Sequence, residues 1–132
     1  MNIVKIDATF HSSIDKVWEL LTDLNHQLWR RSIEKVEIID QHRFIEYDKD
    51  GYKTEFVILN KIENDTYEFN MMNQNMEGHW IGKLKVLDDG LTYLEMTEAI
   101  QMKKKMMSFI VKKYLEKQQK QYIEDLKMAL GE

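Results

Sequence analysis

The final segment of the chain constrains the fold more than any other feature. Residues 103–130 contain no glycine or proline, and Gly131 then provides a residue that commonly ends a helix. An apolar stripe runs along this helix, formed by Ile110, Tyr114, Tyr122 and Leu126 and flanked by Met107, Val111, Leu115, Ile123 and Leu130. We therefore expect one long C-terminal helix that needs an apolar surface to pack against.

The region before this helix has the pattern of a sheet. Between residues 34 and 101, short segments with strand-like alternation are separated by turn residues such as Asp48-Lys49-Asp50-Gly51 and Asp88-Asp89-Gly90. The expected strands lie near 36–38 and at 44–47, 52–59, 67–72, 80–87 and 91–102. Gaps of hairpin length between consecutive strands favour an antiparallel meander over βαβ units.

The N-terminal residues form a separate pattern. Val4, Ile6, Ala8 and Phe10 alternate with polar residues, which predicts a half-buried strand. Ser12 or Ser13 can then cap a helix whose apolar positions are Ile14, Val17, Trp18 and Leu21. A second short helix is predicted at 23–31, with Leu24, Leu28 and Trp29 as its apolar face.

Length and composition limit the possible classes of protein. A chain of 132 residues fits one domain, 1–132, and 43% apolar residues can build its core. A net charge of −4 argues against a nucleic-acid partner, because such proteins carry a basic face. The absence of cysteine excludes disulfides and thiolate sites and suits the cytoplasm. No apolar run is long enough for a signal peptide or an integral membrane span.

Several of these segments resemble one known superfamily. Residues 8–13 (ATFHSS), 16–24 (KVWELLTDL) and Trp29 are similar to the opening of SRPBCC proteins, which include START lipid-binding domains and polyketide cyclase-like proteins. Residues 78–80 (GHW), 89–92 (DGLT) and the long last helix add to the resemblance, which covers nearly the whole chain. It implies an α+β helix-grip fold of order β-α-α-β6-α, in which a curved seven-stranded antiparallel sheet wraps the last helix. It also implies an apolar or amphipathic ligand between sheet and helix.

Strand parity gives the residues that would line such a cavity. The expected lining residues are Tyr67, Phe69, Met71, Trp80, Leu84, Leu94 and Met96 from the sheet and Met106, Ile110 and Tyr114 from the helix. The alternative is that these side chains interdigitate and leave no space, as in an ordinary core.

Glu98 has the same parity as Leu94 and Met96, so we expect it to be the polar anchor of the cavity. A carboxylate on an apolar face loses hydration, which raises its pKa unless a cation or several donors compensate. The alternative is that a bulge near the strand end turns Glu98 into solvent.

Other chemistry has little support in the sequence. The four histidines are far apart and none has a second ligand at helix or hairpin spacing, so we expect neither a metal nor another cofactor. The serines lack an adjacent base, which leaves the catalytic residues unknown. Lysines near 103–105, 112 and 113 could contact anionic lipid, but acidic residues dilute them further along the helix.

Two classes of function remain open. The first is a carrier or sensor that binds a small hydrophobic or amphipathic molecule, and the second is a cyclase- or dehydratase-like enzyme that uses the same cavity. An adaptor that acts through its surface has no supporting patch in the sequence. The pattern defines neither the ligand nor the oligomeric state.

Overall fold

The computed structural model describes the backbone of residues 1–132 and all side chains except those of Met107 and Ser108, so the predicted flanking position of Met107 lies outside the described side chains. Along the chain the elements are β1 (Asn2–Phe10), α1 (Ile14–Thr22), β2 (Ile33–Ile38), β3 (Arg43–Asp48), β4 (Lys53–Ile62), β5 (Thr66–Met72), β6 (Met76–Val86), β7 (Thr92–Met102), the short 3-10 helix η1 (Lys105–Met107) and α2 (Ser108–Ala129).

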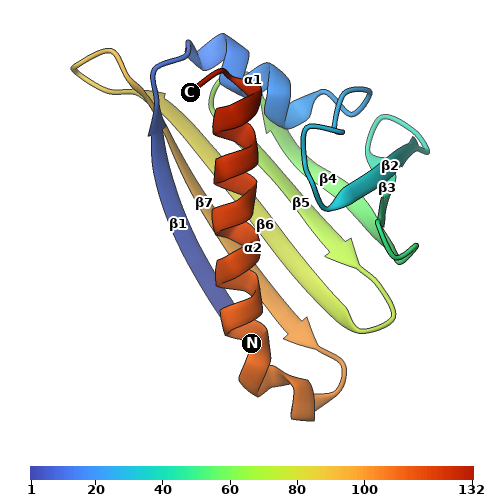
Figure 1. Cartoon of the computed structure of the whole chain (residues 1–132). Coiled ribbons are helices and arrows are strands. Elements are labelled where there is room, and N and C mark those ends of the chain that lie inside the picture. The colour runs from blue at the N-terminus through green and yellow to red at the C-terminus, as the bar shows by residue number, and fades with distance from the viewer.

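The seven strands form one antiparallel sheet in the order β1-β7-β6-β5-β4-β3-β2. Strands β2 to β7 follow one another as a meander, and β1 joins the sheet beside β7, with Ile6 opposite Met96. Figure 1 shows the curved sheet with α2 lying along its concave face and α1 at one end. This arrangement confirms the predicted helix-grip fold.

Helix α1 begins where the sequence predicts. The Ser13 hydroxyl accepts a hydrogen bond from the Lys16 N–H at 3.3 Å, so Ser13 is the N-cap. Ser12 has another role, because its N–H and hydroxyl both donate to the carboxylate of Glu132. The C-terminal end of the chain is thereby held beside the β1–α1 connection.

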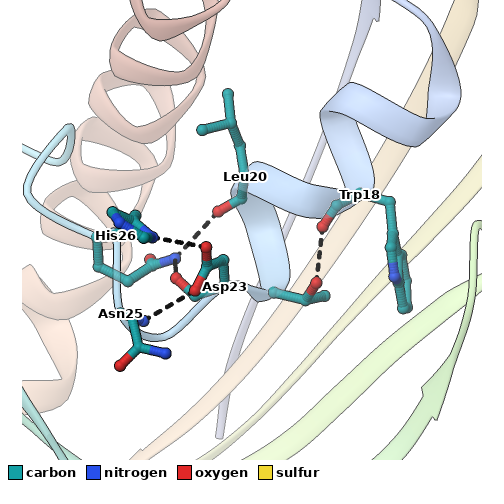
Figure 2. A network of polar contacts seen from close by, with 7 residues as sticks. Trp18, Leu20, Asp23, Asn25 and His26 are labelled. Carbon is teal, nitrogen blue, oxygen red and sulfur yellow. Dashed lines mark hydrogen bonds and ion pairs between the residues drawn. The ribbon is translucent and has the colours of Figure 1, made fainter.

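The second predicted helix, at 23–31, is wrong, because this segment consists of turns. Polar side chains provide hydrogen bonds that compete with a helical backbone (Figure 2). The Asp23 carboxylate accepts the Asn25 N–H, and the Gln27 amide donates to the carbonyls of Leu20 and Asp23 at 3.0 and 2.8 Å. These bonds bind the segment 23–32 to the end of α1 without extending that helix.

The buried face of α2 differs from the predicted stripe. Tyr122 and Leu126 pack against the core as predicted, but Ile110 and Tyr114 are exposed. In the first part of the helix Val111, Leu115 and Gln119 are buried instead, so the inner face there lies one position, about 100° around the helix axis, from the predicted stripe. Both rows are interrupted by a glutamine, Gln118 in the predicted row and Gln119 in the buried one, so this position did not distinguish them in the sequence.

The core lies between the concave face of the sheet and both helices. Phe10 and Leu94 are fully buried, and Trp18 of α1 packs edge-on against Tyr67 of β5 with ring centroids 6.2 Å apart. The position of Trp18 connects α1 to the middle of the sheet.

None of the helices in the described part of the chain combines the length and the apolar character that a bilayer crossing requires.

Replacing Trp18 with Ala should lower the free energy of unfolding by about 3–5 kcal/mol, because the change leaves a large hole in a packed core. Urea denaturation measures this loss. Leu28→Ala is the matched control, since Leu28 is 71% exposed whereas Trp18 is 8% exposed. A Trp18→Ala protein as stable as its parent would contradict the packing of α1 on the sheet.

Candidate functional site

A row of side chains crosses the middle of the concave face. Glu98 of β7 lies opposite Trp80 of β6, and Trp80 lies opposite Phe69 of β5. The rings of Phe69 and Trp80 stack with centroids 4.9 Å apart. The indole also covers Gly82, where a Cβ atom would stand 2.5 Å from the ring. A glycine at this position therefore allows the indole to lie flat along the sheet.

A buried ion pair lies above this row. Arg30, from the segment 23–32, donates two hydrogen bonds to the carboxylate of Glu46 on β3, with N–O distances of 2.5 and 3.1 Å. Their side chains are only 16% and 11% exposed. Burial disfavours the charged guanidinium, but the charge of Glu46 and its hydrogen bonds outweigh burial and raise the pKa of Arg30 above its ordinary value. Arg30 is therefore a permanent cation inside the protein.

Three donors beside this pair have no hydrogen-bond partner within the described residues. They are Trp29 Nε1, Arg30 Nε and the hydroxyl of Tyr67, all of them shielded from solvent. Tyr122 of α2 lies against the same group, with its ring 5.4 Å from Trp29 and 5.3 Å from the Arg30 guanidinium. Because buried polar groups nearly always find partners, this concentration of unsatisfied donors marks a candidate binding site.

Glu98 has the environment predicted from its parity. Loss of hydration raises the pKa of Glu98 to about 7, although the positive charge of Arg30 works in the opposite direction. Burial also raises the pKa of Tyr122 to about 12 and shifts the pKa of Tyr67 upwards. The carboxyl of Glu98 makes no hydrogen bond or ion pair with any side chain that the structure describes. We call Arg30, Glu46, Tyr67, Glu98 and Tyr122 the polar cluster.

The strand residues predicted to line the site share one face of the sheet. Phe69 and Glu98 are partly buried in this face, and the others are buried: Tyr67, Met71, Trp80, Leu84, Leu94 and Met96. Met106, Ile110 and Tyr114 lie on the outer surface, 84%, 63% and 58% exposed, because the inner face of α2 is the row that begins at Val111. The structure therefore does not bring the three helix residues to the concave face.

The aromatic side chains in this region interdigitate. Tyr67 packs edge-on against both Phe69 and Trp80, and Phe44 stacks on Phe56 with centroids 4.7 Å apart. Two pockets that the structure forms lie elsewhere. One of about 620 Å³ lies between α1 and the ends of β2 and β4, and one of about 400 Å³ lies between β1 and α2. Access of a ligand to the polar cluster thus requires side chains to move.

The sequence analysis missed the charged pair. Arg30 belongs to a segment predicted as a helix, and there it follows the apolar face residue Trp29 and would be expected on the solvent-exposed face. Glu46 did carry a signal, because it shares strand parity with the apolar Phe44, as Glu98 does with Met96. A search for carboxylates on apolar strand faces would have found both acids, although not their partner.

The side chains of two histidines, His26 and His79, belong to local hydrogen-bond networks. His79 Nε2 lies 2.5 Å from Glu68, which also accepts a hydrogen bond from Asn60, and His26 contacts Asp23. No group of three or more potential metal ligands occurs among the residues that the structure describes.

Comparisons with known proteins concern the fold. No family model matches the chain, and no curated protein sequence matches it. Solved structures do match over nearly its full length. A START superfamily protein from Mycobacterium smegmatis is 11% identical with a TM-score of 0.87, and the match covers 98% of this chain and 97% of that one. A conserved protein from Geobacillus kaustophilus is also 11% identical, with a TM-score of 0.85, and the match covers 99% of this chain and 95% of that one.

A third structure is a protein of the dynemicin biosynthetic locus, 13% identical with a TM-score of 0.77. The match covers 99% of this chain but 48% of that one. Identities this low establish the fold alone. The curved sheet, the long C-terminal helix and these matches together show that the chain has a helix-grip fold similar to that of the START superfamily protein from Mycobacterium smegmatis.

Proposed function

We propose that this protein binds a small hydrophobic or amphipathic molecule between the sheet and α2, as a carrier or sensor. The observation that carries the proposal is the set of unsatisfied buried donors, Trp29 Nε1, Arg30 Nε and the Tyr67 hydroxyl, beside an aromatic face. Such donors destabilise an ordinary apolar core, because each buried donor left without a partner lowers the stability of the fold by about 1–3 kcal/mol.

The polar cluster and Trp29 indicate which chemical groups the ligand carries. Because the unpaired groups of the protein are hydrogen-bond donors, the ligand carries acceptors, such as carbonyl, ether or hydroxyl oxygens, on a mainly apolar body. Because Glu46 already balances the charge of Arg30, a ligand without full charge avoids a large desolvation cost. The stacked rings of Phe69 and Trp80 suit a flat apolar portion.

Entry of the ligand requires a movable cover. The segment 23–32 meets α2 through the edge contact of Trp29 with Tyr122 and through Arg31, whose Nε lies 2.5 Å from the buried carboxylate of Asp125. The ion pair fixes the position of the segment, whereas the two rings can rotate about their side-chain bonds. We infer that the ligand enters as Trp29 and Tyr122 separate.

The second candidate function is that of a cyclase- or dehydratase-like enzyme at the same place. Glu98 favours it, because a carboxyl with a pKa of about 7 can both donate and accept a proton near neutral pH. The two functions differ in the fate of the ligand. A carrier releases the molecule unchanged, and an enzyme releases a product of different mass or unsaturation, which mass spectrometry of co-purified ligand before and after incubation distinguishes.

The uncharged dye 6-propionyl-2-(dimethylamino)naphthalene, a flat apolar molecule with one carbonyl oxygen, should bind the folded protein with micromolar affinity and increase in fluorescence. Tyr67→Phe removes only an unpartnered hydroxyl, so it should weaken dye binding by about three- to tenfold while leaving stability unchanged or slightly higher. Tyr93→Phe is the control, because the Tyr93 hydroxyl donates to Asp7 on the other face of the sheet. Equal affinities in both variants and the parent would contradict the location of the site.

The raised pKa of Glu98 makes stability depend on pH in a defined direction. The unfolded carboxyl titrates near 4.5 and the folded one near 7, so the folded state retains the proton that the unfolded state has lost. Stability should therefore fall as pH rises from about 4.5 to 7, by at most roughly 3 kcal/mol.

Urea denaturation of Glu98→Gln at pH 5 and pH 8 measures this contribution. The variant should lack the decline that Glu98 causes, and it should be more stable than the parent at pH 8. Glu95→Gln is the matched control from the other face of the same strand, where Glu95 pairs with Lys5. If the stability of Glu98→Gln falls between pH 5 and pH 8 as steeply as that of the parent, the Glu98 carboxyl of the parent is exposed to water and the account is contradicted.

A further inference from the structure

Helix η1 and the adjoining end of α2 expose apolar side chains that do not pack against the core. Phe109 is 89% exposed and Met106 is 84% exposed, and Ile110 and Tyr114 lie beside them on the outer surface. The helix is already packed on its opposite side, through Val111 and Leu115. Figure 1 shows this end of α2 at the far end of the molecule from α1, beyond the strand ends.

The same stretch has a strong positive charge. Residues 103–115 include five lysines, Lys103, Lys104, Lys105, Lys112 and Lys113, and no acidic residue, although the whole chain has a net charge of −4. All five side chains are exposed. The backbone that carries the first of them is held in place, since the Lys103 N–H donates to the carbonyl of Asn75 at 2.9 Å. We call this surface the lysine–aromatic end.

The exposed apolar side chains and the positive charge together indicate the kind of partner that this surface binds. Exposed Phe and Met side chains with surrounding lysines insert below the headgroups of an anionic bilayer, while the ammonium groups remain among the phosphates. A second copy of this chain does not fit, because pairing through this end would bring two sets of five lysines together. A purely apolar partner would leave the lysine charges without counterions.

We propose that the lysine–aromatic end docks the protein on the surface of membranes that contain anionic lipids. Met106 and Phe109 enter the interface, and the five lysines supply the electrostatic attraction, at about 1 kcal/mol each near a negatively charged surface. Neither contribution holds the protein alone, so the contact is reversible and sensitive to salt. The inference goes beyond the proposed function, because docking needs neither the polar cluster nor a bound ligand.

Flotation with vesicles tests the proposal directly. The full chain should float with vesicles of phosphatidylcholine and phosphatidylserine at 50 mM salt, and it should bind pure phosphatidylcholine vesicles at least about tenfold more weakly. Changing Lys103, Lys104 and Lys105 to Gln should reduce binding to the anionic vesicles by roughly 100-fold. The matched control changes three exposed lysines elsewhere, Lys16, Lys61 and Lys83, to Gln and should bind as the parent does.

A second pair of variants tests insertion. Met106→Gln with Phe109→Gln should reduce vesicle binding at least about tenfold, whereas Leu59→Thr with Ile62→Thr, two exposed apolar positions on β4, should leave it unchanged. The proposal is overturned by equal binding to neutral and anionic vesicles, by unchanged binding of the Met106 and Phe109 variant, or by salt-resistant dimers in sedimentation velocity that need Phe109.

Dye binding at the polar cluster is measured separately on the same variants and should not change, so each proposal can fail without the other.

Discussion

The fold depends on covering the concave face of one curved sheet. That face carries most of the aromatic side chains of the strands, and β1 extends it by pairing with β7, far away in the sequence. Only α2 is long enough to cover its length, and α1 with the segment 23–32 closes one end. Because a single helix is narrower than the sheet, the remaining area is covered by side chains of the segment 23–32. This requirement places Trp29 and Arg30 over the strands.

Burial of a charged residue follows from that geometry. Arg30 reaches the sheet over Tyr122, and Glu46 meets it with two hydrogen bonds. Losing either partner of such a buried pair costs about 3–5 kcal/mol, whereas replacing both by apolar residues is often neutral. Stability alone therefore does not explain the pair. The charges of the pair act on Glu98, and Arg30 Nε has no partner among the described residues, so we propose that the pair serves ligand binding.

The sequence predicted most of the fold and the strand residues of the candidate site. Strand alternation and the uninterrupted segment 103–130 were sufficient for the sheet and for α2, and the parity of Glu98 predicted its raised pKa. The failures arose where side chains decide backbone geometry. The hydrogen bonds of Gln27 favour turns over a helix, and Gln118 and Gln119 interrupt two neighbouring rows of α2 alike, so the sequence did not reveal which row is buried. Arg30 could not be predicted, because its burial depends on contacts between segments distant in sequence. Ile110 and Tyr114, which were predicted to line the cavity, instead belong to the exposed surface at the lysine–aromatic end.

The central claim is that a ligand binds against the concave face, and methyl NMR locates it most directly. The nine methionines can be labelled with 13C at the methyl group, and they sample both regions: Met71 and Met96 are buried beside the aromatic rings, while Met106 and Met128 are exposed. On titration with 6-propionyl-2-(dimethylamino)naphthalene, we expect the methyl signals of Met71 and Met96 to shift in a saturable manner and that of Met128 to remain in place. Shifts confined to exposed methionines, with Met71 and Met96 unchanged at saturation, would contradict the account.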